Sequence, residues 1–250
     1  MARISAVLFD MDDTLIDWSR AEGDIAAIEA KHMANVYRHL ADQDHLLPPF
    51  QSFLDQFHNA MVNAWTEAKK SWSGVSFGSL LRDFLATCGL DTNKIDLDAV
   101  MQAYNWSVIP GVAPFDDTLF VLAQLKEAGY KIGLITNAMQ PMWMRDIELR
   151  AFGILDYLDA RLTSGDVGFM KPHPFIYHRA LELLDVAPEA AVFVGDRPAN
   201  DIAGANKAGL ISVLISPPHL NRDLADTRPN YTISQLTELL PILAELEGDT

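Results

Sequence analysis

The sequence has very little cysteine. Cys88 is the only cysteine among its 250 residues. A disulfide bond within one chain is therefore excluded, and so is a metal site built from several thiolates. A single thiol is typical of a protein that works in a reducing compartment.

Long apolar runs are also missing. No stretch reaches the roughly 18 to 20 apolar residues that a membrane span requires. The apolar segment in MARISAVLFDMDD is too short for the central region of a signal peptide, and two aspartates follow where a small-residue cleavage site would lie. We therefore expect a soluble, cytoplasmic protein without a membrane partner.

Positive charge is scarce. The chain has 19 Lys and Arg residues against 34 Asp and Glu, which gives a formal net charge of −15. Nucleic-acid polymers are bound through clustered Lys and Arg, so this charge argues against such a partner. A small phosphate ester is not excluded, because a divalent cation and one well-placed lysine reverse the local charge.

Short apolar runs rich in β-branched residues alternate with segments of helical spacing. The runs cover residues 4–9, 131–135, 191–194 and 211–215, with a weaker one at 160–163. The helical segments are 118–128, 142–150, 175–184, 202–208 and 233–246. Gly129, Gly153 and Gly209 stand where helices should end. This alternation predicts an α/β fold, a doubly wound Rossmann-like parallel sheet with helices on both faces.

Residues 20–106 show no strand pattern. Their apolar spacing predicts four helices, at 25–40, 50–69, 77–88 and 97–106. We predict an α/β catalytic core of residues 1–17 and 108–250, and an inserted all-helical cap of residues 18–107. The chain enters the cap near Trp18 and leaves it near Pro110, where IPGVAP is typical of a hinge.

Polar residues follow the predicted strands, at the sheet edge where open parallel sheets bind ligands. Asp10 begins DMDDTL, Thr136 and Asn137 follow the second strand, and Asp196 begins DRPAND. In DMDDTL, Asp12 or Asp13 is about as well explained as a helix cap. A calcium-binding EF-hand loop is rejected, because Leu15 and Ala21 occupy the positions that need glycine and glutamate.

The segment GDRPAND presents Asp196 and Asp201 at the start of a predicted helix. Either residue alone is explained as a cap. Brought next to Asp10, these carboxylates would repel each other unless a cation lay among them, and Mg²⁺ is the natural candidate. Thr136 and Asn137 alone suit a turn, and Lys171 in KPHP alone suits a solvated surface. Their joint placement at strand ends favours a functional site.

Together these residues resemble the haloacid dehalogenase (HAD) superfamily of aspartate-nucleophile phosphatases. Its four motifs occur in order as DMDDTL, LITN, KPHP and GDRPAND, and the resemblance covers nearly all of the predicted core. It implies that Asp10 is the nucleophile and Asp12 the general acid and base. It also implies that Thr136, Asn137 and Lys171 hold the transferring phosphoryl group.

The same resemblance implies a Mg²⁺ site. Its ligands would be Asp10, the backbone carbonyl of Asp12, Asp196 and, directly or through water, Asp201. Asp12 favours a phosphatase over a dehalogenase, since halide needs no acid in order to leave. Two departures stand out: Arg197 and Pro198 replace a small hydroxyl residue, and Asp13 replaces the more frequent glycine. Whether Arg197 points toward the metal or outward stays open.

The predicted cap resembles the smaller helical type that is inserted after the first motif. Lys171 comes 34 positions after Asn137, which leaves little room for a cap between them. Within the cap, Trp65, Lys69, Lys70 and Trp72 are candidates for substrate contact, although such residues more often pack between helices or are solvated. Arg20 and residues 139–143 are further candidates. The cap histidines His32, His39, His45 and His58 are not expected to bind metal.

The leading hypothesis is Mg²⁺-dependent hydrolysis of a small phosphate monoester, such as a sugar phosphate or a nucleoside monophosphate, through an aspartyl-phosphate. Phosphomutase activity is an alternative on the same fold, and 2-haloacid dehalogenation is less favoured. A non-catalytic binding module would usually have lost Asp10, Asp12 or Lys171, and all three are present. The expected partner is a small phosphorylated metabolite, bound by a monomer or a homodimer.

Overall fold

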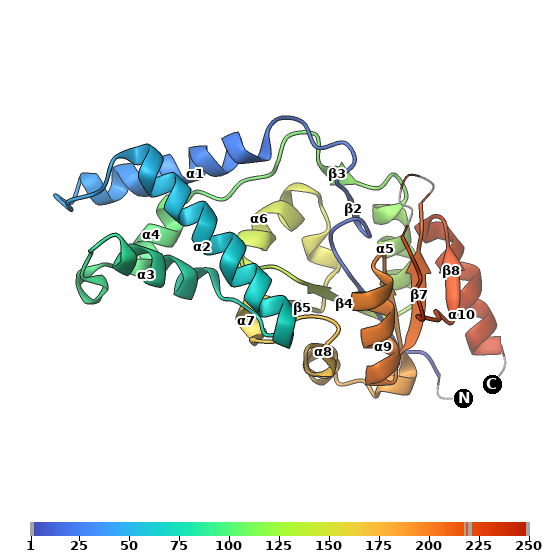
Figure 1. Cartoon of the computed structure of the whole chain (residues 1–250). Coiled ribbons are helices and arrows are strands. Elements are labelled where there is room, and N and C mark those ends of the chain that lie inside the picture. The colour runs from blue at the N-terminus through green and yellow to red at the C-terminus, as the bar shows by residue number, and fades with distance from the viewer. Residues whose placement is uncertain (1–2, 218, 220–221, 249–250) are drawn as a thin grey trace.

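A computed structural model describes residues 3–217, 219 and 222–248. In this part of the chain a six-stranded parallel sheet has the order β5-β4-β1-β6-β7-β8 (Figure 1). Its strands are β1 (Ala6–Phe9), β4 (Lys131–Thr136), β5 (Ala160–Thr163), β6 (Ala191–Gly195), β7 (Ile211–Ile215) and β8 (Tyr231–Ile233). The predicted α/β fold with a parallel sheet is confirmed.

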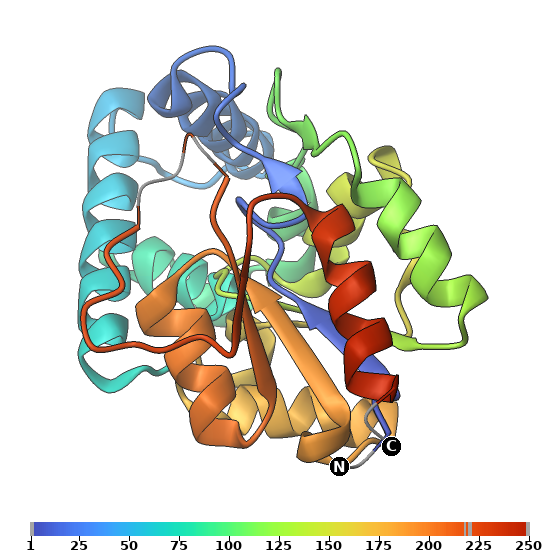
Figure 2. The same cartoon turned by 90° about the vertical axis from the view of Figure 1, so that its right-hand side faces the viewer.

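Helices cover both faces of this sheet (Figure 2). They are α5 (Thr118–Glu127), α6 (Met142–Ala151), α7 (Ser164–Val167), α8 (Pro174–Leu184), α9 (Ala203–Ala208) and α10 (Leu239–Gly248). Alternate strand residues point to opposite faces. Val7 and Phe9 pack in one cluster with residues of α5 and α10, whereas Ala6 and Leu8 pack in another with residues of α8 and α9. Burial on both faces explains the continuous apolar runs.

The C-terminal segment differs from its prediction. A helix over 233–246 is wrong in its first part, because Tyr231–Ile233 forms the edge strand β8 parallel to β7, and α10 begins only at Leu239. Leu239, Leu243 and Leu246 are buried at helical spacing, which is the pattern that the prediction detected. A three-residue strand is too short to show its own alternation.

The long insertion is helical, as predicted. It contains α1 (Ile25–Ala41), α2 (Phe50–Ser71), α3 (Phe77–Thr87) and α4 (Leu97–Ala103), which lie to one side of the sheet (Figure 1). These helices enclose an aromatic cluster of their own; the Phe53 and Phe84 rings, for example, meet edge to face at 4.7 Å. The short strands β2 (Ile16–Asp17) and β3 (Ala113–Pro114) pair antiparallel where the chain enters and leaves the insertion. The division into two domains stays a prediction.

The turn between α2 and α3 lies against loops that follow strands of the sheet. Gly74 N–H donates to Gly168 at 2.8 Å, and Phe77 N–H donates to the Met139 carbonyl at 3.0 Å. A Cβ atom on Gly74 would fall 1.8 Å from the carbonyl oxygen of Ser164, so only glycine permits this approach. The insertion therefore covers the carboxyl edge of the sheet. No helix in the described ranges is both long and apolar enough to cross a membrane.

Candidate active site

Asp10 lies at the centre of the carboxyl edge of the sheet. Its strand β1 runs between β4 and β6, so the residues that follow these three strands converge. Asp10 is only 5% exposed. Burial raises the pKa of its carboxyl group well above the ordinary value, Lys171 opposes this effect, and Asp201, Asp196 and Asp12 add to it. The chain thus places a carboxylate where it needs a cationic partner.

Lys171 supplies that partner. Its Nζ lies 2.6 Å from Asp10 Oδ1 and 2.7 Å from Asp201 Oδ1, and the residue is 2% exposed. Burial alone would lower the pKa of this lysine, but Asp10 and Asp201 raise it above the ordinary value. Lys171 is therefore charged over the whole neutral range and neutralises the two carboxylates that it bridges.

Asn137 fixes the backbone of Lys171. Its side-chain Nδ2 donates to the Lys171 carbonyl at 2.9 Å, and its Oδ1 accepts from Lys171 N–H at 2.8 Å. Both polar ends of the amide are thereby used within the protein. Sequence reasoning expected Asn137 to hold phosphoryl oxygens; the structure shows that its side chain positions Lys171, which lies in the same cavity.

Three carboxylates gather beside Lys171. Asp10, Asp196 and Asp201 each offer an oxygen, and these oxygens lie within 4.8 Å of one another. Among the described atoms, the buried Asp196 Oδ1 has no hydrogen-bond partner. A hard divalent cation with oxygen ligands, such as Mg²⁺, fits this donor set. The side chain of Asp12 is not part of the group, so its expected contribution through the backbone carbonyl stays a prediction.

The turn after β6 brings Asp201 to this position. Pro198–Ile202 forms a π-helical turn, η4, in which Arg197 N–H donates to Asp201 Oδ2 at 2.8 Å. A Cβ atom on Gly195 would lie 2.5 Å from that of Asp201, so glycine is required at the end of β6. The hydroxyl group of the buried Tyr177 donates to the Asn200 carbonyl at 2.9 Å and supports the turn from below.

Two arginines lie near the three carboxylates. Arg197 lines the same cavity as Asp10, which answers the question of its direction. Arg222 Nη2 lies 2.7 Å from Asp196 Oδ2 and 3.0 Å from Asp13 Oδ2. Asp13 has a left-handed backbone, φ 60°, which explains why glycine is frequent there and why aspartate is tolerated. Sequence reasoning did not identify Arg222, whose sequence neighbours give no motif.

The Asp12 carboxylate lines the same cavity as Asp10 and is bonded to α6. Its Oδ1 accepts from Arg145 Nη2 at 2.6 Å and from Trp18 Nε1 at 2.8 Å, and its Oδ2 accepts from Thr136 Oγ1 at 3.2 Å. Burial acts to raise the pKa of Asp12, but the charge of Arg145 and these hydrogen bonds outweigh it, so the pKa lies below the ordinary value. Three groups thus fix the orientation of this carboxylate.

Arg145 and Glu148 form a buried ion pair that the sequence analysis missed. Arg145 is 4% exposed and Glu148 is 1% exposed, and Arg145 Nη1 lies 3.0 Å from Glu148 Oε2. Burial raises the pKa of Glu148 to about 7, Arg145 lowers it and Asp12 raises it. Because Arg145 pairs with both carboxylates, it connects α6 to the first motif.

The raised pKa of Glu148 predicts that this residue makes the free energy of unfolding depend on pH. The folded state binds this proton more tightly than the unfolded state, so Glu148 lowers stability as pH rises from its ordinary pKa of 4.5 toward 7. Replacing Glu148 with Gln removes this contribution. Relative to the wild type, the variant should therefore gain about 2 kcal/mol in unfolding free energy between pH 5 and pH 8. Urea denaturation of both proteins at pH 5 and pH 8 measures these unfolding free energies. If variant and wild type differ by the same amount at both pH values, Glu148 does not ionise as a buried group in this range.

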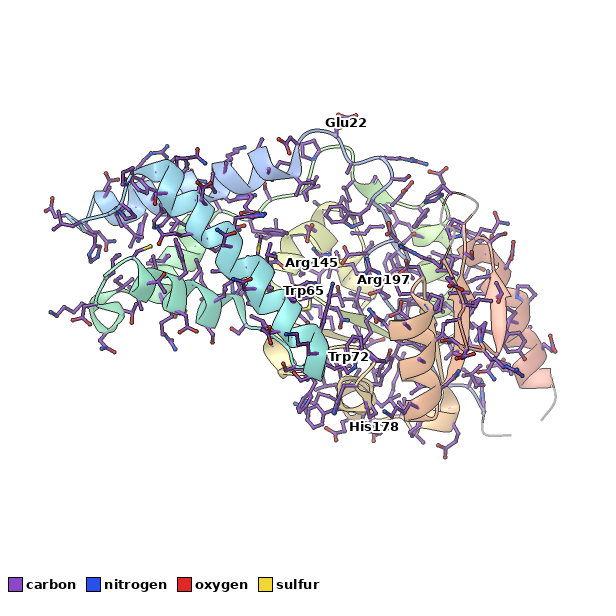
Figure 3. All side chains as sticks on the ribbon, viewed as in Figure 1. Glu22, Trp65, Trp72, Arg145, His178 and Arg197 are labelled. Carbon is purple, nitrogen blue, oxygen red and sulfur yellow. The ribbon has the colours of Figure 1, made fainter. Side chains whose placement is uncertain are left out.

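A cavity of about 450 Å³ contains most of the predicted site. Asp10, Asp12, Thr136, Asn137, Lys171, Asp201 and Arg197 line it from the sheet side. Trp65 and Lys69 line it from α2, and Trp72 lines it from the position directly after this helix; Figure 3 shows Trp65 on α2 and Trp72 at its end. Three of the four cap residues singled out in the sequence therefore reach the cavity. The fourth, Lys70, lies 2.6 Å from Glu67 on the exposed side of α2.

Among the remaining candidates, Met139 and Gln140 of the 139–143 segment line a neighbouring cavity, whereas Arg20 lines neither. Arg20 pairs with Asp17 at 3.1 Å beside the entrance to the insertion. The His32 ring stacks on Tyr104 at 4.8 Å, and its Nδ1 donates to the Tyr104 carbonyl at 2.9 Å. The metal-ligand group found among the described residues consists of Asp10, Asp196 and Asp201.

The chain matches the family model of the haloacid dehalogenase-like hydrolases over residues 4–209. It is 31% identical to the glyceraldehyde 3-phosphate phosphatase of Methanopyrus kandleri, across 98% of this chain and 100% of that protein. It is 32% identical to the pyrophosphatase PpaX of Bacillus anthracis, across 98% of each.

Solved structures give the same result. A 2-haloacid dehalogenase from Pseudomonas syringae superposes with a TM-score of 0.66 at 27% identity, covering 97% of this chain and 99% of the other. A HAD phosphatase from Thermococcus onnurineus has a TM-score of 0.60 at 26% identity, covering 96% and 98%. Fold and comparisons together define a hydrolase with a Rossmann-like core. The chain belongs to the haloacid dehalogenase-like hydrolase family, as its motifs predicted.

Proposed function

We propose that this hydrolase is a Mg²⁺-dependent phosphatase that cleaves small phosphate monoesters through an aspartyl-phosphate on Asp10. The observation that carries the proposal is the placement of Asp10. Its carboxylate lies 2.6 Å from the buried Lys171, next to Asp196 and Asp201, in a cavity that Asp12 also lines. Relatives named as phosphatases for glyceraldehyde 3-phosphate and pyrophosphate support a small phosphorylated substrate.

The first half of the reaction transfers the phosphoryl group to the enzyme. An Asp10 oxygen attacks phosphorus, and the bond from phosphorus to the ester oxygen breaks. Asp12 gives its proton to the departing alkoxide, which leaves as an alcohol. Lys171 and Thr136 line the cavity in which the phosphoryl oxygens gain negative charge. Hydrogen-bond donors that are already in place around that charge stabilise the transition state.

The second half releases the phosphate. Asp12, now a carboxylate, accepts a proton from water as the water oxygen attacks phosphorus, and the bond between Asp10 and phosphorus breaks. Inorganic phosphate and the original enzyme result. Asp10, Asp196 and Asp201 would hold the Mg²⁺ ion, which when bound neutralises charge on the phosphoryl group and on the three carboxylates. The helices above the cavity exclude bulk water from both steps.

Phosphate release from a panel of esters tests this function. The panel contains glyceraldehyde 3-phosphate, several sugar phosphates, nucleoside monophosphates and pyrophosphate, each with Mg²⁺ and with a chelator in its place. We expect phosphate release from at least one monoester with Mg²⁺ and a fall to background with the chelator. Equal rates in both solutions contradict the metal requirement. Halide release from 2-chloropropionate without phosphate release from any ester contradicts the phosphatase.

A further inference from the structure

A second cavity, of about 410 Å³, adjoins the first. The two cavities share Asp12, Trp65 and Asn137. Asp10, Lys171 and Asp201 line only the first one, and Arg145 lines only the second. The predicted nucleophile therefore faces one cavity, whereas the predicted acid faces both.

This arrangement gives the second cavity a role in the proposed reaction. In an in-line displacement the leaving group departs on the side opposite to the nucleophile. The acid must lie within hydrogen-bond reach of the leaving oxygen. The chamber that contains Asp12 but not Asp10 is therefore where the rest of the substrate lies.

Most of the residues that line this chamber are aromatic or apolar, and Thr66, Asn137 and Gln140 add neutral polar groups. Trp18, Trp65 and Trp106 line it together with Met61 and Met139. Figure 3 shows Trp65 on α2 close to Arg145 of α6. Indole rings favour flat partners by stacking and by burial, and methionine sulfur also contacts aromatic rings favourably.

The chamber has almost no free charge. Its two ionic groups, Asp12 and Arg145, lie 2.6 Å apart and neutralise each other, and the second guanidinium nitrogen of Arg145 lies 3.0 Å from Glu148. A charged leaving group would lose its hydration there without gaining an ionic partner.

From these contacts we propose that the substrate is the phosphate ester of an alcohol that carries a neutral aromatic ring, which lies between Trp65 and the other tryptophans of the second cavity. The inference rests on the proposed phosphatase function. The proposed substrate differs from glyceraldehyde 3-phosphate and pyrophosphate, the compounds for which two relatives are named. The leaving groups of those two compounds are small and polar.

Two primary-alcohol esters test the proposal. Benzyl phosphate and glycerol 3-phosphate have similar leaving oxygens and differ mainly in the ring. With wild-type enzyme and Mg²⁺, we expect kcat/KM for benzyl phosphate to be at least about tenfold higher, since stacking and burial of a ring give that much. Equal or lower kcat/KM for benzyl phosphate overturns the aromatic assignment.

Variants locate the effect. Trp65→Ala and Met61→Ala, both on α2, should lower kcat/KM for benzyl phosphate about five- to tenfold more than they lower kcat/KM for glycerol 3-phosphate. Trp143→Ala is the matched control, because Trp143 is 42% exposed on α6 and lines neither cavity. Equal losses on both esters in the α2 variants overturn the assignment.

A binding measurement keeps this inference separate from the proposed function. Benzylphosphonate and propylphosphonate are not hydrolysed, and their affinities follow from quenching of tryptophan fluorescence in the presence of Mg²⁺. We expect benzylphosphonate to bind at least about tenfold more tightly. If that preference holds while no ester is hydrolysed, the aromatic chamber stands and the phosphatase fails. Equal affinities overturn the chamber even if esters are hydrolysed.

Discussion

Replacing Asp10 with Asn is expected to abolish phosphate release, with a loss of about 10⁴-fold or more in kcat, because the nucleophile is removed. The amide has nearly the shape of the carboxylate and still accepts from Lys171. The ester therefore binds, with less repulsion than in the wild type, and is not cleaved. Phosphate release from the best ester of the panel measures the loss.

Trapping sharpens this result. Rapid acid quenching of the wild type during turnover of a ³²P-labelled ester should leave label on the protein that hydroxylamine removes, as it does from an acyl phosphate. Asp10→Asn should carry no such label. Asp55→Asn is the matched control, since Asp55 is exposed on α2 and accepts a hydrogen bond from its neighbour Gln51. Full activity of Asp10→Asn, or label retained on it, refutes the assignment of the nucleophile.

The sequence predicted the centre of the fold because burial leaves a clear pattern there. Residues 160–163 and 211–215 match β5 and β7 end to end. The run in β7 is mostly apolar because both faces of the strand are covered, whereas the partly buried edge strand β5 shows the weaker pattern. Gly129, Gly153 and Gly209 have left-handed backbones, as predicted for helix ends. The short strands β2, β3 and β8 were missed. They have two or three residues each, which is too few for an alternating pattern to be recognised.

The same distinction applies to the site, where residues at strand ends were predicted and residues placed by packing were not. Asp10 and Asp196 directly follow β1 and β6, and Thr136 ends β4; parallel strands bring such positions together whatever the loops do. Arg145 and Arg222 instead reach the site from α6 and from a loop distant in sequence. Nothing in the spacing of either residue distinguishes it from a solvated surface arginine, and only packing places its charge.

Arg145 changes how the predicted acid must work. A general acid needs its proton at neutral pH, yet Arg145 and two hydrogen bonds hold the pKa of Asp12 below its ordinary value in the free protein. A phosphate dianion that enters the cavity brings negative charge next to Asp12 and raises that pKa again. We therefore propose that the carboxylate gains its proton when the substrate binds. In the second half of the reaction it is poised as the base.

Replacing Asp12 with Asn separates these two roles. For esters of ordinary alcohols, we expect kcat to fall about 10²- to 10⁴-fold, because an alkoxide leaves slowly without a proton. For 4-nitrophenyl phosphate the leaving group needs no acid, so the first step persists and only the water step slows. Stopped-flow absorbance should then show a burst of about one nitrophenolate per active site, followed by slow turnover.

The burst is the decisive observation, because a variant that is merely misfolded loses both phases together. Asp116→Asn provides the control: Asp116 has a side chain that is 89% exposed, and within the described part of the chain its ion pair is a 3.7 Å contact with Arg20. It should hydrolyse both esters at the wild-type rate. If Asp12→Asn loses the same factor on both esters without a burst, then Asp12 holds Arg145 in place but transfers no proton, and the acid must be sought among other groups of the two cavities.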